Sequence, residues 1–458
     1  MLLGPLFEPF VASRPICVMA RGVLERLLDP ERIDELFDET AERQYTRDLL
    51  FSTLVGLMGD VVLGVQPSVH AAYQARRDEV GVSTTAVYNK LDRVETGISA
   101  ALVGESAREA GLLIDALKAR MEPWVPGYRC RVLDGNHLSA TEHRIEELRH
   151  TWAAPLPGKL LVVLDPERML IDEVFLTEDG HAQERRLLGE VLETVQADDL
   201  WIADRNICTF NFMSTVAASN AFFLIRQHGQ YNPCLSGKRR KIGDSETGVV
   251  YEQSARLIDQ PSGAELKVRR ITVALKEKTR DGYEEIHILT NLPTKAADAV
   301  TLSDVYRKRW TIESVFLELT TTLNCEIQTL GYPPAALFAF CLAVLAWNAV
   351  SVLKASLRAV HGEQTVRENV SGYYLALEIW QTWDGMQIAI PDECWRPLRA
   401  LTATEMAQVL RQVAGHVNLS RYQKHPRGPK KKPPPKDKYK PGGHVSTAKL
   451  LSKRREPC

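Results

Sequence analysis

Five short apolar segments between residues 129 and 226 constrain the possible folds of this chain more than any other feature. They are rich in aliphatic and β-branched residues and occupy 131–137, 160–165, 169–176, 200–205 and 221–226. Their lengths suit strands rather than helices. Helical patterns separate the last three segments, at about 183–195 and 210–218. The order of three strands, helix, strand, helix and strand predicts an α/β fold built on one open sheet.

Two of the predicted strands reach an aspartate at their carboxyl end. Asp134 is followed by a glycine that suggests a turn, and Asp204 follows the run Leu-Trp-Ile-Ala. In open α/β sheets the chemistry is found outside the carboxyl ends of the strands. One carboxylate in such a place is ordinarily a turn residue, so the functional interpretation depends on a third.

That third carboxylate is Glu313, in a helical pattern predicted for residues 304–324. Tyr306, Arg309 and Glu313 are three and four residues apart, so their side chains rise from one helix face. Three converging carboxylates repel one another unless a cation lies between them. Hard oxygen ligands favour Mg²⁺ or Mn²⁺, and two such ions would promote in-line attack on a phosphodiester. The three carboxylates are therefore the predicted metal ligands and catalytic residues.

The order of the elements is that of a ribonuclease H-like α/β core, predicted for residues 126–355. Within it, β-like runs separated by Pro, Gly and charged turns predict a β-rich antiparallel insertion at 229–293. An all-helical N-terminal domain at 1–125 is expected before the core. A helical C-terminal region at 356–420 and a basic tail at 421–458 are expected after it.

Three segments suggest contacts with nucleic acid. Residues 83–93 form a capped polar helix, which is either a recognition helix or a plain amphipathic helix. Four consecutive basic residues at 238–241 either bind phosphate or form a solvated turn. The last 38 residues hold 13 Lys and Arg against 2 acidic residues, while the preceding residues hold 44 against 56. This tail is predicted to be disordered and favours a polyanionic partner, with a solubilising tail as the alternative.

The remaining composition favours a cytoplasmic protein that is not inserted in a membrane. The eight cysteines show no C-x-x-C pair, which favours reduced thiols over a zinc site or a disulfide framework. The N-terminus lacks the pattern of a signal peptide. One apolar stretch, 335–353, is long enough to span a membrane, but its Trp347, Asn348 and Ser351 favour a buried core helix.

Together, the carboxylates and the helix around Glu313 resemble those of a DDE transposase. The closest resemblance is to the bacterial insertion-sequence-four group, whose ribonuclease H-like core has a β-strand insertion before the glutamate. Its signature is Tyr, two residues, Arg, three residues, Glu, six residues, Lys. This chain has Tyr306, Arg309 and Glu313 at these places and Thr320 where the lysine stands. The resemblance covers essentially the whole chain.

The resemblance implies cut-and-paste DNA transposition that depends on two Mg²⁺ or Mn²⁺ ions. Water would nick the end of the mobile element, and the freed 3′-hydroxyl would attack the second strand or the target DNA. The implied partners are double-stranded DNA with terminal inverted repeats, target DNA and a second copy of the chain. Tyr306 and Arg309 would hold phosphates, and Lys308 and Arg205 are further predicted DNA contacts. Trp310 either accommodates distorted hairpin DNA or packs in the core.

Two other functions remain open at this stage. One is a catalytically inactive, transposase-derived regulator that binds DNA, although the presence of all three carboxylates argues against it. The other is a ribonuclease H-like nuclease that cleaves without strand transfer, which the residues themselves do not exclude.

Overall fold

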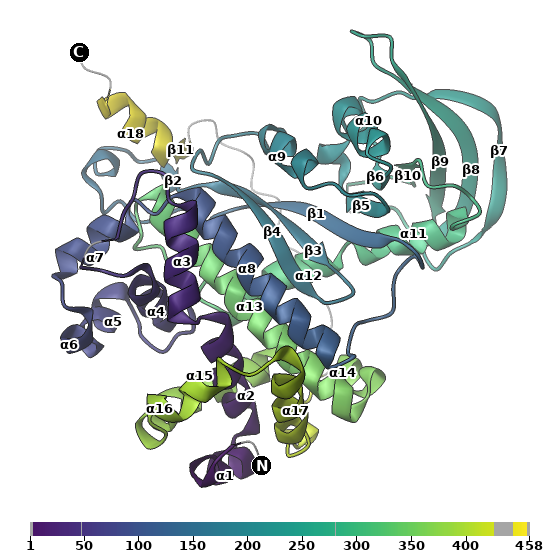
Figure 1. Ribbon diagram of the computed structural model, residues 1–458. Coiled ribbons are helices and arrows are strands. Elements are labelled where there is room, and N and C mark those ends of the chain that lie inside the picture. Colours follow the sequence, from purple (N-terminus) through teal and green to yellow (C-terminus); the bar gives the residue numbers. More distant parts are fainter. Residues whose placement is uncertain (1–2, 47, 280, 426–442, 456–458) are drawn as a thin grey trace.

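A nine-stranded mixed sheet organises the molecule, seen in a computed structural model that describes residues 3–46, 48–279, 281–425 and 443–455 (Figure 1). The strand order is β4-β3-β1-β5-β6-β10-β9-β8-β7. The strands are β1 (Arg129–His137), β3 (Lys159–Asp165), β4 (Leu170–Thr177), β5 (Asp199–Ala203), β6 (Phe222–Arg226), β7 (Cys234–Asp244), β8 (Gly248–Ile258), β9 (Glu265–Leu275) and β10 (Glu285–Thr290).

The first half of the sheet contains the five strands expected from the sequence. β1, β5 and β6 run parallel, and Leu133 of β1 lies opposite Ala203 of β5. β3 pairs antiparallel with both β1 and β4. One boundary differs from expectation, because β1 does not turn after Asp134 but continues to His137, opposite Lys159 of β3. This arrangement confirms a mixed α/β fold.

The segment predicted as a β-rich insertion does not form a separate sheet. Its strands β7 to β10 are antiparallel, and β10 pairs with β6, so they prolong the central sheet. The basic residues at 238–241 lie on the edge strand β7, which corrects the prediction of a turn. The sequence did not indicate this strand. Ten of its eleven residues are exposed, with Gly243 the exception, so it lacks the alternation of buried and exposed positions by which a strand is recognised.

Helices cover both faces of this sheet (Figure 1). On one face α9 (Leu188–Glu193) and α10 (Phe210–Ala218) lie over a cluster that includes the fully buried Trp201 and Phe212. The helix predicted at 183–195 begins with a 3₁₀ turn, Glu184–Leu187, before α9. On the other face lie α8 (Thr96–Ala116), α11 (Ala299–Lys308) and α13 (Pro333–His361).

The apolar helix α13 is the core helix that the sequence predicts at 335–353. In its most apolar window 94% of the residues are buried, although its length and composition would also suit a membrane span. It packs against α2 (Pro15–Leu27), α4 (Phe51–Val62), α8 and α17 (Ala403–Ala414). Asn348 is fully buried within it and ties the helix to β4. Its amide accepts from the backbone N–H of Ile171 at 3.0 Å and donates to the carbonyl of Ile171 at 2.8 Å.

Helices make up the described chain before β1, as predicted for the N-terminal region, and most of the chain after α13. In α7, Ser83 caps the helix as expected, but the ammonium of Lys90 donates to the carbonyl of Leu49 at 2.6 Å. Lys90 is therefore engaged within the protein. The remaining helices are α1 (Glu8–Ser13), α3 (Pro30–Thr40), α5 (Val69–Ala75), α6 (Arg77–Val80), α7 (Thr84–Leu91), α12 (Thr311–Thr322), α14 (Glu363–Asn369), α15 (Gly372–Ala389) and α16 (Asp392–Trp395).

Part of the basic tail is ordered, which corrects the prediction of disorder for 421–458. β11 (His444–Ser446) pairs in parallel with β2 (Ala154–Leu156), and α18 (Thr447–Arg455) follows it. Ser446 and Thr447 are buried at this junction, so burial by a distant segment outweighs the polar composition around them. The proline-rich basic run at 430–435 lies outside the described residues.

The bond between Asn348 and Ile171 provides a test of the packing of α13. Asn348→Leu should lower the free energy of unfolding by about 2–4 kcal/mol, because it leaves a buried N–H and a buried carbonyl without partners. Urea unfolding followed by circular dichroism measures this. Ser356→Ala on the same helix is the control, because its hydroxyl donates to the helix carbonyl of Val352. An equal effect of both substitutions would contradict this role for Asn348.

Candidate active site

The fold brings the two predicted aspartates to one edge of the sheet. Asp134 follows Leu133 on β1, and Asp204 follows Ala203 at the end of β5, so the two lie just beyond paired positions of neighbouring parallel strands. The carboxylate of Asp204 caps a short 3₁₀ turn by accepting from the N–H of Asn206 at 2.7 Å. Glu313 reaches the same edge from the first turn of α12.

Arg309 connects Asp134 and Glu313. One guanidinium nitrogen lies 2.7 Å from Oδ2 of Asp134 and another 2.9 Å from Oε1 of Glu313. Arg309 is 7% exposed, and its Nε has no hydrogen-bond partner among the described residues. Nearby Tyr306, Asp134 and Glu313 more than offset the effect of burial and raise the pKa of Arg309. The guanidinium therefore carries its charge between two of the three carboxylates.

The pKa of Asp134 shows that Asp134 interacts with Arg309 and with the other two carboxylates. Burial raises the pKa of Asp134 to about 6, Arg309 opposes the rise, and the charges of Asp204 and Glu313 add to it. Burial likewise raises the pKa of Tyr306 to about 12, so its phenol stays protonated at neutral pH. The site thus combines three interacting carboxylates with a cation and a hydrogen-bond donor.

The helix predicted for residues 304–324 is two helices, which corrects that expectation. α11 ends at Lys308 and α12 begins at Thr311. Across the junction, N–H groups bond three residues back: Arg309 to Tyr306 at 3.1 Å and Trp310 to Arg307 at 3.3 Å. Bonds of this kind form a tighter turn than an α-helix. At this turn Arg309 is buried, whereas the neighbouring Trp310 is 61% exposed. Trp310 is therefore not a core residue.

A cavity of about 570 Å³ contains most of the predicted site. Its walls come from the end of β5, from β6, from the segment between β9 and β10, from β10, and from the α11–α12 junction. They are formed by Asp204, Arg205, Arg226, Thr279, Asp281, Ile286, Tyr306, Arg309, Trp310 and Glu313. Asp134 adjoins this cavity through its ion pair with Arg309.

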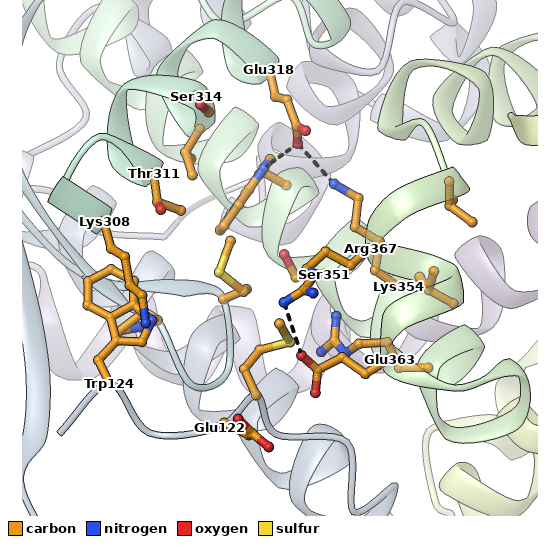
Figure 2. Close-up of a pocket in the computed structure, with 18 of the residues that line it drawn as sticks. Glu122, Trp124, Lys308, Thr311, Ser314, Glu318, Ser351, Lys354, Glu363 and Arg367 are labelled. Atoms are coloured by element: carbon orange, nitrogen blue, oxygen red, sulfur yellow. Dashed lines mark hydrogen bonds and ion pairs between the residues drawn. The ribbon is translucent and has the colours of Figure 1, made fainter. Parts of the chain in front are cut away.

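Lys308 faces a different cavity, of about 490 Å³, whose lining includes Thr311, Ser314 and Glu318 of α12 but not Glu313 (Figure 2). There its ammonium lies 5.7 Å from the ring centroid of Trp124. At the other side of this cavity Glu318 accepts from Lys354 at 3.0 Å and from the indole of Trp347 at 3.2 Å. Thr320 bonds within its own helix, where its hydroxyl donates to a backbone carbonyl at 3.1 Å. Neither Lys308 nor Thr320 lines the cavity that holds Glu313.

A fourth carboxylate, Glu184, was not anticipated from the sequence. A Cβ atom at Gly135 would lie 2.6 Å from its carboxyl carbon, so a side chain at 135 would displace it. Oε2 of Glu184 also accepts from the amide of Asn206 at 3.4 Å. The sequence signal was the glycine after Asp134, which indicated a turn but provides space for Glu184.

The donor set suits a hard divalent cation, although among the described residues no group of three His, Cys, Asp or Glu side chains is arranged to hold a metal. Asp134, Asp204 and Glu313 supply carboxylate oxygens, the ligands that Mg²⁺ and Mn²⁺ favour. A cationic guanidinium already lies between two of them, so this place favours positive charge. The chemistry of the three carboxylates therefore suits such an ion, while in this structure the guanidinium of Arg309 occupies the place between Asp134 and Glu313.

Comparison with known proteins supports this interpretation of the site. Residues 125–349 match the family model described as Transposase DDE domain. The matched segment contains the three carboxylates, and the match supports a DDE transposase, an enzyme that acts on DNA. No curated protein matches the chain.

Among solved structures, the chain is similar to one described as a piggyBac transposase synaptic complex with hairpin DNA. It is 8% identical in sequence, with 88% of this chain and 85% of that chain covered and a TM-score of 0.38.

The raised pKa of Asp134 predicts that its charge destabilises the fold. In an unfolded chain an aspartate has a pKa of about 3.9, and in the folded protein the value is about 6. The unfolded chain therefore binds fewer protons between these values, and stability falls as pH rises from about 4 to 6. Asp134→Asn should raise the free energy of unfolding at pH 8 by about 1–3 kcal/mol.

Urea unfolding of wild type and Asp134→Asn at pH 4 and pH 8 measures this effect without divalent cations. The gain should be largest at pH 8 and should shrink towards pH 4. A gain of the same size at both pH values would show that the titration of Asp134 is not its source.

Proposed function

We propose that this protein is a DDE transposase that moves a mobile DNA element by cut-and-paste transposition. One observation supports this proposal most strongly. Asp134, Asp204 and Glu313 lie close enough for their charges to interact, within a segment that matches the transposase DDE domain. The order β4-β3-β1-β5-β6 supports a ribonuclease H-like core. With the Tyr306, Arg309 and Glu313 spacing, it favours the insertion-sequence-four group.

In the proposed reaction, the three carboxylates hold two Mg²⁺ or Mn²⁺ ions. When bound, such ions lower the pKa of a nucleophilic water or hydroxyl and stabilise the leaving oxygen. Water attacks the phosphodiester at the end of the element and releases a 3′-hydroxyl. That hydroxyl then attacks a second phosphodiester, first in the element's other strand and later in the target DNA.

The chain's own residues position the phosphate for these steps. Arg309 leaves the carboxylates and donates its forked N–H groups to the phosphate, for which a guanidinium is well shaped. Tyr306 stays protonated and donates to a phosphate oxygen. Trp310, exposed at the cavity wall, offers a ring on which an unpaired base of hairpin DNA can stack. Arg205, which also lines the cavity, contributes further positive charge.

The proposed partners are double-stranded DNA with terminal inverted repeats, target DNA and a second copy of the chain that pairs the element ends. The helical region at 1–125 would contribute to DNA binding, and the exposed polar residues of its 83–93 segment are Ser83, Thr85, Asn89 and Arg93. The helical region at 356–420 would support the catalytic core at 126–355. The cytoplasm is the proposed compartment.

Two rival functions differ from this proposal in what they predict. An inactive regulator would bind the element ends and leave them intact. A nuclease without strand transfer would cut them but would not join the 3′ ends to a second DNA. The retention of all three carboxylates favours the transposase over the regulator.

Glu313→Gln should abolish cleavage while DNA binding is retained, because it removes a ligand charge and almost no volume. A labelled duplex with the terminal repeat that flanks the coding sequence, incubated with Mg²⁺ and an unlabelled target plasmid, reports nicking and strand transfer. Loss of activity should exceed about 10³-fold, the scale of removing an essential catalytic group. Asp134→Asn and Asp204→Asn should behave alike.

Glu318→Gln is the matched control, because it makes the same change on the same helix, where Glu318 pairs with Lys354. It should cleave at close to the wild-type rate. Wild-type protein that binds the repeat but never cuts it would favour the regulator. Cutting without joining would favour the nuclease.

The position of Arg309 predicts how stability responds to Mg²⁺ without DNA. Mg²⁺ should raise the melting temperature of wild type, and Arg309→Met should show a larger rise, because the carboxylates then lack their internal cation. A difference of about 2–5 °C is expected from ligand linkage. Differential scanning calorimetry with Mg²⁺, and with matched ionic strength from NaCl, measures it. An equal rise in wild type and Glu313→Gln would place the ion elsewhere.

A further inference from the structure

A second, smaller cavity adjoins the cavity that holds Glu313. Its volume is about 260 Å³. It lies at the sheet edge where β5 and β6 end and β10 begins. Its walls are Arg205, Arg226, Gln227, His228, Gly229, Asn232, Arg270, Tyr283, Glu285 and His287. Arg205 and Arg226 line both cavities, so the two share a wall.

Three arginines meet at this cavity, and in the described structure none of them forms an ion pair with a carboxylate. Arg205 lies 3.3 Å from the hydroxyl of Tyr283, and the guanidinium of Arg226 lies 5.4 Å from the centroid of the same ring. Arg270 donates to the amide oxygen of Gln227 at 2.8 Å. All these partners are neutral.

Two other arginines of this half of the sheet, one on β8 and one on β9, form ion pairs with glutamates, which makes this cluster distinctive. Arg256 pairs with Glu265 at 3.1 Å, and Arg269 pairs with Glu252 at 2.8 Å. A set of guanidinium groups held by neutral side chains leaves its charge available to an external anion.

The acidic and titratable groups at the cavity offset only part of this charge, through the attraction between Glu285 and Arg270. Glu285 already accepts from Arg239 of β7 at 2.8 Å. Burial, with Arg270 next in effect, lowers the pKa of His287 to about 4, so its ring is neutral at pH 7. The cavity therefore presents three positive groups beside one carboxylate that is engaged elsewhere.

We propose that this cavity binds a phosphate group of the same DNA strand whose scissile phosphate lies at Asp204 and Glu313. A phosphodiester fits because guanidinium groups bind phosphate oxygens through paired N–H donors. The strand reaches the cavity because Arg205 and Arg226 form the wall that separates it from the carboxylates. This inference rests on the proposed function for its substrate.

Tyr283 is a positioning residue in this arrangement. It lies between β9 and β10, is 45% exposed, and contacts Arg205 through its hydroxyl and Arg226 through its ring. By holding both guanidinium groups without neutralising them, it keeps them spread around the cavity. The strands that prolong the sheet thus build the wall along which the DNA strand leaves the catalytic carboxylates.

The test compares DNA binding by Arg226→Gln and Arg270→Gln with that by Arg256→Gln, all in the Glu313→Gln background so that the DNA stays intact. Both cavity variants should bind terminal-repeat DNA about 5–20-fold more weakly at ~0.15 M salt. In each variant the slope of the logarithm of the binding constant against the logarithm of the salt concentration should be smaller in magnitude by about 1. Arg256→Gln, which removes an arginine already paired with Glu265, should change neither quantity. Calorimetric melting confirms that the variants are folded.

Single methylphosphonate substitutions locate the phosphate. Making one backbone phosphate near the cleavage position neutral should weaken binding by the Glu313→Gln parent but should have no further effect on the two cavity variants. The proposal would be overturned if, at every phosphate position, the loss of DNA affinity caused by the methylphosphonate simply added to the loss caused by the arginine substitution. A second result would also overturn it. If inorganic phosphate raises the melting temperature of the parent but not of the cavity variants, and the variants bind DNA normally, the cavity would be a site for free phosphate.

The outcome is separable from that of the proposed function. Cleavage and joining are measured with Glu313 intact, whereas these binding experiments do not require chemistry. A protein that never cleaves DNA but shows the methylphosphonate pattern would retain this site and lose the transposase proposal. If the Arg226→Gln and Arg270→Gln variants transpose as efficiently as wild type, the transposase proposal would stand and the phosphate site would be lost.

Discussion

The ion pairs of Arg309 join two parts of the chain that lie far apart in the sequence. Asp134 comes from the sheet and Glu313 from a helix 179 positions later in the sequence, and one guanidinium contacts both. Without a cation between them, carboxylates at this spacing would repel one another, and burial would add to the cost. The arginine therefore offsets the repulsion between these two carboxylates within the protein itself.

The sheet explains where a substrate can lie. Because β7 to β10 continue the sheet beyond β6, the segment between β9 and β10 contributes Thr279 and Asp281 to the lining of the cavity of Glu313. The basic cluster of Arg205, Arg226 and Arg270 lies along the same edge. Positive charge next to the carboxylates suits a polyanionic strand, since the attraction between each guanidinium and a phosphate offsets the repulsion between the DNA and the acidic residues.

Much of the central fold was predictable from local sequence patterns. The five strands of the first half are apolar runs, and α13 is an apolar stretch too long for a strand, so burial and periodicity were enough to find them. The edge strand β7 and the ordered part of the tail were missed because neither carries an apolar pattern. β7 is held by pairing with β8, and β11 by pairing with β2, and such partners are invisible in a local window. The break between α11 and α12 was missed because both sides keep a helical periodicity.

The sequence alone determined the chemical inventory of the site. It supplied three carboxylates in a suggestive order, with Tyr306, Arg309 and Trp310 beside the last of them, because residue types and short spacings are local properties. The tertiary structure decided which groups meet. It placed Arg309 between two acids, turned Lys308 towards Trp124 and gave Glu184 its space beside Gly135. It also gathered three arginines from separate parts of the chain at one cavity. Those contacts depend on strand register and on long-range packing, which no short stretch of sequence encodes.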